Sequence, residues 1–256
     1  MGARITAGTA ARSRIVEGVM AEALREAMAG AGLDNAVLLA GFATPAVPEA
    51  IAALGGRSVR WNRRCGPGID DASPWPPAGP HTAAALRLPK SRGEIDMAVH
   101  AIASSVVAEG PIFVCGANDE GIKSAAAHLA PLLGAVETIT VKNHCRVLAV
   151  RRPGAMASLR GSLTDWRETF VVDLGDGPRS WVSYPGLFAH GRIDEGTKLL
   201  LANLPPLRPG ARVLDFGCGT GVIAAAARAT STDLDLTLLD SDSVALEAAR
   251  ENVPGA

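Results

Sequence analysis

Short apolar runs alternate with helical patterns along most of this chain, and this alternation constrains the fold more than any other feature. Val37–Ala40 is a compact apolar run, Pro48–Leu54 has helical character, and Arg57–Trp61 is a second strand-like run. A strand–helix–strand order of this kind favours a mostly parallel sheet with helices on its faces. The sequence therefore predicts an α/β fold.

The same rhythm continues on both sides of one interruption. Prolines and glycines crowd residues 65–80, which excludes a helix there and predicts a long loop. Residues 1–151 are predicted to form one α/β domain. Its further helices are expected at 14–28, 94–108 and 120–133, and its further strands at 84–88, 111–115, 136–141 and 146–150.

A second α/β domain is predicted at residues 167–256, after a linker at residues 152–166. A doubly wound sheet needs about five or more strands, and the only parallel strands expected here are two, at 213–215 and 236–240. We therefore expect this second domain to be incomplete in the chain. The remaining elements of this part are strands at 169–174 and 180–183 and helices at 194–203 and 244–252.

Composition supports packed domains and gives little general attraction for nucleic acid. Apolar residues make up 48% and charged residues 20%, so disorder is not expected. The net charge is −1, so any contact with RNA must come from local basic patches. The cysteines form no Cys-x-x-Cys pair, which predicts no metal site and fits a cytoplasmic protein. No stretch approaches the ~20 apolar residues of a membrane span, so no membrane contact is expected.

The segment Asp215–Gly221, with sequence DFGCGTG, follows an apolar strand and precedes an Ala-rich helix. Glycines let the backbone turn tightly and approach a ligand closely, and amides at a helix start face an anionic group. Asp240 ends the next strand, about 20 residues after the glycines, where an acid accepts hydrogen bonds from ribose hydroxyls. The pattern therefore predicts a nucleotide site.

The details of this loop favour one kind of nucleotide. Val222 stands where a dinucleotide fingerprint has its last glycine. An acid ahead of the glycines, Asp215, would repel a pyrophosphate and suits a ligand with an ammonium group. The methionine end of S-adenosylmethionine carries such a group, and we expect this cofactor.

Several segments resemble the methyltransferase-small family. Residues 184–201 and 213–223 resemble its cofactor-binding domain, and residues 88–90 and 112–124 are similar to the N-terminal domain of one branch. That branch methylates guanine N2 in small-subunit ribosomal RNA, and the resemblance covers roughly residues 80–256. It implies two tandem Rossmann-like methyltransferase-type domains, of which the front one has lost cofactor binding.

The resemblance also implies which residues bind the cofactor and what the substrate is. The expected partner is ribosomal RNA or the small ribosomal subunit, and the oligomeric state stays open. Phe188 and Asp194 are expected beside the cofactor; the alternative interpretations are a hydrophobic anchor for Phe188 and a helix N-cap for Asp194, and Asp194 could have both roles. The cofactor-binding residues are expected to be Asp215, Phe216, Gly217, Cys218, Gly219, Thr220, Gly221, Asp240, Ser241, Phe188 and Asp194.

The family's catalytic motif, Asn-Pro-Pro-Phe or Asn-Pro-Pro-Tyr, orients the target amine. No such motif occurs in this sequence, so we expect a chain cut off before its catalytic residues and inactive by itself. Two alternatives stay open. One is a methyltransferase acting on protein glutamine or another small substrate, and the other is a non-catalytic RNA-binding or assembly protein.

A cluster of arginines, Arg57, Arg60, Arg63 and Arg64, surrounds Trp61. Arginines bind phosphates and an exposed tryptophan can stack on a base, so this cluster is one candidate for contact with RNA. The other interpretation, which we favour, is a solvated strand end with a half-buried tryptophan.

Overall fold

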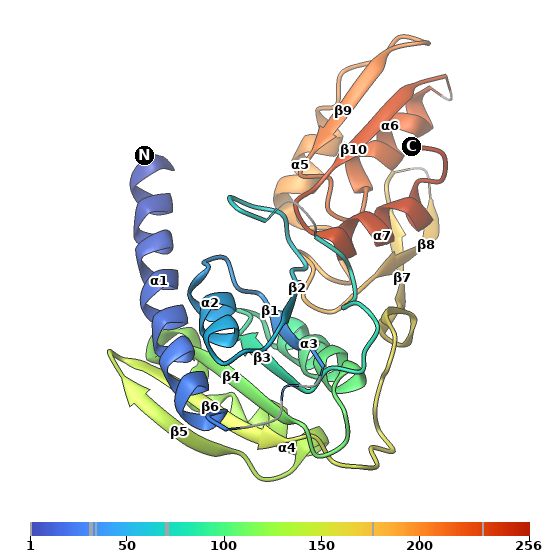
Figure 1. Cartoon of the computed structure of the whole chain (residues 1–256). Coiled ribbons are helices and arrows are strands. Elements are labelled where there is room, and N and C mark those ends of the chain that lie inside the picture. Colours follow the sequence, from blue (N-terminus) through green and yellow to red (C-terminus); the bar gives the residue numbers. More distant parts are fainter. Residues whose placement is uncertain (1, 31–32, 34, 70–71, 176, 232) are drawn as a thin grey trace. The chain divides into compact units, whose positions relative to one another are not determined.

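The computed structural model describes residues 2–30, 33, 35–69, 72–175, 177–231 and 233–256, with the side chains of residues 2–9 left aside. The chain divides into two compact units, which Figure 1 shows with unit 1 in blue to yellow-green and most of unit 2 in orange and red. Unit 1 comprises Met1–Asn62, Pro67–Asp70 and Trp75–Ser162, and unit 2 comprises Arg63–Gly66, Asp71–Pro74 and Leu163–Ala256.

Unit 1 follows the strand–helix rhythm that its sequence predicts. Its elements are α1 (Gly2–Ala27), β1 (Val37–Ala40), α2 (Ala46–Ala53), β2 (Ser58–Trp61), β3 (Ala83–Arg87), α3 (Arg92–Ser105), β4 (Pro111–Ala117), the 3₁₀ turns η1 (Asn118–Glu120) and η2 (Ile122–Ser124), α4 (Ala126–Leu133), β5 (Glu137–Lys142) and β6 (Cys145–Arg151).

The strands of unit 1 form one six-stranded sheet in the order β2-β1-β3-β4-β6-β5. The first four strands in this order are parallel, whereas β6 runs antiparallel to β4 and β5 runs antiparallel to β6. The sheet order reverses at β1, as in a doubly wound fold.

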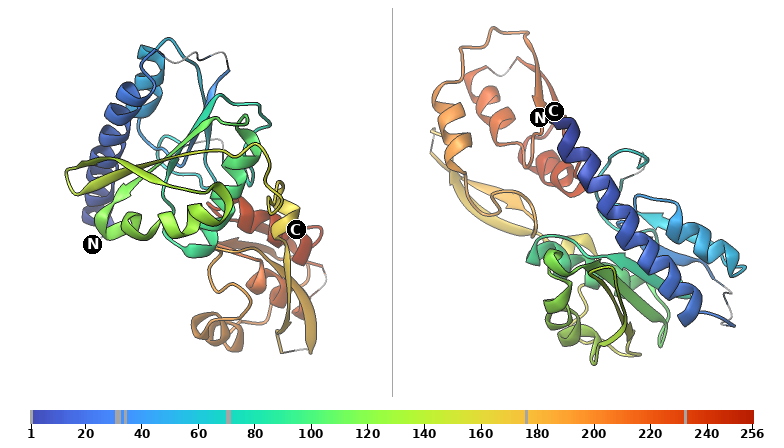
Figure 2. Two further views of the ribbon diagram at one scale, coloured as in Figure 1. Left: turned by 90° about the horizontal axis from the view of Figure 1, so that it is seen from below. Right: turned by 90° about the vertical axis from the view of Figure 1, so that its left-hand side faces the viewer.

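Both faces of this sheet are covered by helices. In β1, Leu38 and Ala40 belong to a buried cluster with residues of α3 and α4, and Val37 and Leu39 belong to one with residues of α1 and α2. All four residues of β1 are buried, as expected of a parallel strand between two helical layers. The long helix α1 can be followed in blue in both views of Figure 2.

Two expectations for unit 1 were wrong in extent. The helix α1 starts at Gly2 rather than near residue 14, because Ala and Arg are frequent in this stretch and both favour helix. The helix expected over 120–133 is broken into η1, η2 and α4. Gly121 adopts φ of 90°, and the Glu120 carboxylate accepts a hydrogen bond from the Ala117 amide at 2.9 Å. The chain therefore turns sharply before α4 begins.

Unit 2 contains two separate two-stranded sheets. Strands β7 and β8 form an antiparallel hairpin, whereas β9 and β10 pair in parallel with Asp215 opposite Leu238. Its elements are η3 (Leu163–Trp166), β7 (Glu168–Asp173), β8 (Pro178–Ser183), α5 (Glu195–Ala202), β9 (Arg212–Phe216), α6 (Val222–Thr230), β10 (Asp235–Leu239) and α7 (Ser243–Asn252).

The pair β9–β10 is covered on one face only within the described residues. Leu236 is 6% exposed and packs with α6, whereas three apolar side chains on the other face, Leu214, Phe216 and Leu239, are 58%, 79% and 47% exposed. Both faces of these two strands therefore carry apolar side chains, although one face is exposed. Parallel strands of this kind normally have both faces buried.

Candidate functional site

The glycine loop, Asp215–Gly221, joins β9 to α6 in a backbone conformation that requires glycine. Gly217, Gly219 and Gly221 have φ of 76°, 54° and 87°, in the left-handed region that side chains disfavour. A Cβ atom placed on Gly217 or Gly219 would meet nothing within 4 Å, whereas one on Gly221 would lie 2.8 Å from Val253 Cγ2. The first two glycines thus leave an open backbone cradle, and the third allows close packing beneath it.

The acid loop, which we define as Asp240, Ser241 and Asp242, lies directly against the glycine loop. The amides of Gly217 and Cys218 donate to the Leu239 carbonyl at 2.7 and 3.1 Å. The Asp240 carboxylate accepts from the Gly219 amide at 2.8 Å. Asp240 Oδ1 also accepts from the Asp242 amide at 2.8 Å. A carboxylate can accept about four hydrogen bonds, so Asp240 keeps capacity for two hydroxyls.

Asp215 lies inside unit 2 and is 7% exposed. Its Oδ2 atom accepts a hydrogen bond from the Ala224 amide at 3.1 Å, at the start of α6. Burial raises the pKa of this carboxyl, the Ala224 hydrogen bond lowers it, and the negative charge of Asp240 adds to the rise. Burial therefore makes the ionised form of Asp215 costly for stability, and a nearby cation would offset this cost.

Replacing Asp215 with asparagine should raise thermal stability in a pH-dependent way. The pKa of Asp215 is higher in the folded state than in the unfolded state. The protonated carboxyl therefore stabilises the folded wild type below the ordinary pKa of about 4, and this stabilisation is lost as the pH rises through the folded-state pKa. The melting temperature of D215N should therefore exceed that of the wild type by a few degrees at pH 7 and by less near pH 4. A melting series over pH measures this.

Asp235→Asn is the matched control, since the Asp235 side chain is 70% exposed and lies 3.7 Å from Arg212. Its melting temperature should follow the wild type at every pH. A constant difference between D215N and the wild type across the pH range would contradict the assignment of a buried, destabilised carboxylate.

Cys218 and Thr220 have structural contacts within the glycine loop. Cys218 is buried, which raises the pKa of its thiol to about 12 and keeps it protonated. Trp181 Nε1 donates to Thr220 Oγ1 at 2.9 Å, and Asn252 Nδ2 donates to the Thr220 carbonyl at 3.0 Å. Asn252 also pairs with both backbone groups of Val182, at 2.8 and 2.9 Å. The hairpin β7–β8 and α7 thus fix the loop.

The other expected site residues differ in their contacts. Phe188 is 82% exposed and Phe216 is 79% exposed. Asp194 caps α5 by accepting from the amides of Gly196 and Thr197, at 3.0 and 3.2 Å, and the Thr197 hydroxyl, its strongest partner, lowers the pKa of its carboxyl. The Ser241 carbonyl accepts from the Cys65 amide at 2.8 Å. Asp194 is therefore a helix cap, and the two phenylalanines are open to a ligand or partner.

Unit 1 has no equivalent cradle after its first strand. The loop after β1 has Gly41 as its only glycine, and the buried Glu17 carboxylate fills the space beside it. This carboxylate, 1% exposed, accepts from the amides of Ala43 and Thr44 at 3.1 and 2.8 Å and from the Thr44 hydroxyl at 2.6 Å. A protein carboxylate thus takes the amides that an anionic ligand would use.

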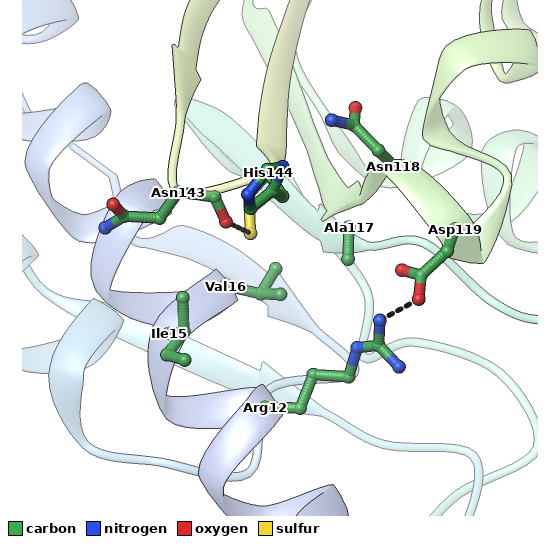
Figure 3. Close-up of a pocket in the computed structure, with 9 residues that line it drawn as sticks. Arg12, Ile15, Val16, Ala117, Asn118, Asp119, Asn143 and His144 are labelled. Atoms are coloured by element: carbon green, nitrogen blue, oxygen red, sulfur yellow. Dashed lines mark hydrogen bonds and ion pairs between the residues drawn. The ribbon is translucent and has the colours of Figure 1, made fainter.

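Figure 3 shows a pocket of about 440 Å³ in unit 1, which contains none of the expected cofactor residues. Arg12 and Asp119 form an ion pair across it. Asn143 and His144, with φ of 51° and 59°, form the β5–β6 turn at its rim. The Arg12 guanidinium in this pocket is therefore already paired with a carboxylate.

The arginine cluster around Trp61 is not a stacking surface. Trp61 is only 6% exposed, which excludes stacking on a base by its ring. Arg60 donates to the Phe42 carbonyl at 2.9 Å. The favoured interpretation, a solvated strand end with a half-buried tryptophan, is also wrong in part, because Trp61 is buried and the Arg63 side chain is only 9% exposed against Asp242.

In residues 2–30, 33, 35–69, 72–175, 177–231 and 233–256, no group of three or more His, Cys, Asp or Glu side chains could hold a metal ion. No helix in the same described part combines the length and apolar composition that crossing a membrane requires.

Two family descriptions match the chain. Methyltransferase small domain matches residues 179–255, a range that includes the glycine loop and the acid loop. Methyltransferase small domain N-terminal matches residues 72–169. Together the two matches cover more than half of the chain.

Two curated relatives share one name. Ribosomal RNA small subunit methyltransferase C of Ectopseudomonas mendocina (strain ymp) is 39% identical over 174 residues, which are 68% of this chain and 51% of the relative. The protein of the same name from Stutzerimonas stutzeri (strain A1501) is 36% identical over 194 residues, covering 76% of this chain and 55% of the relative. The chain spans about half the length of the curated relatives it matches.

One solved structure is similar over most of the chain. It is the T. thermophilus 16S rRNA N2 G1207 methyltransferase in complex with AdoMet and guanosine, with a TM-score of 0.72 and 19% identity. The similarity covers 91% of this chain and 65% of that chain. At this identity the similarity concerns the fold, and it confirms the predicted α/β class with tandem methyltransferase-type domains.

Proposed function

Because the chain belongs to the methyltransferase small-domain family, we propose that it binds S-adenosylmethionine for the methylation of guanine N2 in small-subunit ribosomal RNA. The observation that carries the proposal is the contact between the glycine loop and Asp240. When bound, this cofactor supplies a methyl group on a sulfonium centre. The residues of the chain bind and orient it.

The residues of the site fit this cofactor in three respects. The backbone of Gly217 and Gly219 is open, because an added Cβ would meet nothing within 4 Å; this is where the methionine part would lie. Asp215 supplies a negative charge for its ammonium group, and that group would offset the cost of burying the carboxylate. Asp240 has unused acceptor capacity for ribose hydroxyls.

We further propose a domain plan in which residues 1–151 are a degenerate methyltransferase-like domain, 152–166 a linker and 167–256 the start of the cofactor-binding domain. The Glu17 carboxylate on the loop after β1 supports the loss of cofactor binding in the front domain. The free cysteines fit a reducing compartment such as the cytoplasm.

Ribosomal RNA is the proposed substrate because the curated relatives are named for its methylation. The matched part of this chain spans about half the length of the proteins that carry this name, so the proposal concerns a longer protein that also contains an Asn-Pro-Pro-Phe or Asn-Pro-Pro-Tyr motif. Within residues 1–256 the sequence has no such motif, and we expect the purified chain alone to transfer no methyl group.

A labelling experiment tests the substrate. Small ribosomal subunits from a strain that lacks the full gene are incubated with radiolabelled S-adenosylmethionine and either the 256-residue chain or a form extended to include the motif. The extended form should label ribosomal RNA on guanine N2, and the 256-residue chain should label nothing above background.

Three other outcomes contradict parts of the proposal. Label in protein and not in RNA would favour a glutamine or small-substrate methyltransferase. RNA binding without transfer by the extended form would favour a non-catalytic assembly protein. Clear turnover by the 256-residue chain would disprove the role given to the missing motif.

A further inference from the structure

The segment Arg63–Gly66 belongs to unit 2 and lies along the acid loop. Arg64 and Asp242 form an antiparallel bridge. The Cys65 amide donates to the Ser241 carbonyl at 2.8 Å, and the Ser243 amide and hydroxyl both donate to the Arg63 carbonyl, at 2.9 and 2.7 Å. Backbone hydrogen bonds therefore connect the acid loop and the start of α7 to residues that precede them by more than 170 positions in the chain.

Side chains strengthen this attachment through one carboxylate. Arg63 Nε lies 2.7 Å from Asp242 Oδ1, and Arg64 Nη2 lies 3.0 Å from Asp242 Oδ2. The side chains of Arg63 and Asp242 are 9% and 10% exposed. Asp242 Oδ1 also accepts from the Val244 amide at 3.1 Å and so caps α7. A buried carboxylate with these contacts requires its cationic partner, since an uncompensated buried charge is strongly disfavoured.

Asp242 connects Arg63 to the cofactor acid. The Asp242 amide donates to Asp240 Oδ1 at 2.8 Å, and Asp240 Oδ2 accepts from the Gly219 amide at the same distance. A continuous series of contacts thus runs from Arg63 through Asp242 and Asp240 to the glycine loop. The orientation of the Asp240 carboxylate depends on where the Asp242 backbone lies.

The guanidinium of Arg63 has two further donors. Nη1 lies 3.5 Å from the Pro185 carbonyl, which precedes the exposed Phe188 by three residues. Nη2 is buried and has no hydrogen-bond partner in the part of the chain that the structure describes. A planar fork that spans two backbone segments is a geometry that lysine, with a single ammonium group, cannot reproduce.

We propose that Arg63 is a positioning residue for the nucleoside half of the cofactor: it holds Asp242, and through it sets the Asp240 carboxylate for the ribose hydroxyls. This inference rests on the proposed function of the site. In the part of the chain that the structure describes, the Arg63 side chain contacts Asp242 and the Pro185 carbonyl rather than the glycine loop or Asp240, so its effect is transmitted by the acid loop.

The test compares Arg63→Met and Arg63→Lys with Arg212→Met. The control removes an arginine of unit 2 whose side chain is 90% exposed and 3.7 Å from Asp235. Calorimetry measures the affinity of each protein for S-adenosylhomocysteine and for its 2′-deoxyribose analogue. Amide hydrogen exchange at Gly219 and Asp242 is followed without any ligand.

R63M should weaken binding of S-adenosylhomocysteine by about tenfold or more, the effect of losing one charge-assisted hydrogen bond. It should affect the deoxyribose analogue less, so the preference for the ribose hydroxyl falls. R63K should retain part of that preference. In both variants the Gly219 and Asp242 amides should exchange faster than in the wild type, and R212M should match the wild type throughout.

Equal weakening of both ligands would show that Arg63 has a general structural role and would overturn the inference. Unchanged exchange at Gly219 and Asp242 in R63K would also overturn it, even if R63M does not fold. Absence of S-adenosylhomocysteine binding by the wild type would instead refute the proposed function, and the exchange data would still decide whether Arg63 orders the acid loop.

Discussion

Replacing Gly221 with valine should unfold unit 2 or leave it markedly unstable. Gly221 has φ of 87° and is the N-cap residue of α6, so any side chain there is strained. A Cβ would lie 2.8 Å from Val253 Cγ2 and 3.5 Å from both Ala249 Cβ and Leu238 Cδ2. Backbone strain and overpacking of this kind each cost about 1–3 kcal/mol. Limited proteolysis and a melting curve should show loss of the folded state of unit 2.

Gly217→Ala separates stability from binding at the same loop. Gly217 has φ of 76°, but its added Cβ would meet no atom within 4 Å, so only the backbone strain of about 1–2 kcal/mol remains. Unit 2 of this variant should stay folded, while the new methyl group fills the cradle and abolishes cofactor binding. Equal loss of stability in the two variants would contradict the packing role given to Gly221.

Replacing Asp240 with alanine should reduce cofactor affinity by about 100-fold or more, because hydrogen bonds to charged groups contribute about 1.5–3 kcal/mol each and two are expected with ribose. The variant also loses the contacts of the Asp240 carboxylate with the Gly219 and Asp242 amides. Asp240→Asn, which keeps one acceptor oxygen, should show an intermediate affinity. Isothermal calorimetry with S-adenosylhomocysteine measures both.

Asp235→Asn is again the control, since Asp235 lies at the other end of β10 and its side chain is 70% exposed. Its affinity for S-adenosylhomocysteine should equal that of the wild type. Wild-type affinity in D240A would mean that the acid does not contact the nucleoside, and the cofactor site would have to lie elsewhere.

Elements with a strong local pattern were predictable from sequence. The strand β1 was predicted with its observed bounds, Val37–Ala40. A short apolar run that ends at a glycine is too short for a helix and is typical of a buried strand. The sequence assigned the glycine loop and Asp240 to one nucleotide site, and the structure brings Asp240 Oδ2 to 2.8 Å from the Gly219 amide. Parallel pairing of β9 and β10 brings their carboxyl ends together, which makes this contact a consequence of the fold.

Contacts between distant positions could not be read from local patterns. Trp181 and Asn252 fix Thr220 from 39 and 32 residues away, and neither lies in a recognisable motif. Arg63 was grouped with an arginine cluster because of its neighbours in sequence, yet it is buried against Asp242. The prediction of one helix over 120–133 was wrong because Gly121 adopts a left-handed conformation, which interrupts a helix whatever the apolar pattern around it.

Calorimetric titration of the wild-type chain with S-adenosylmethionine and, separately, with NAD tests the central claim most directly. Asp215 ahead of the glycines, and Val222 in place of a further glycine, favour a ligand with an ammonium group over a pyrophosphate. We predict saturable binding of S-adenosylmethionine and no measurable heat with NAD. A preference for NAD, or binding of neither ligand, would contradict the assignment of this site.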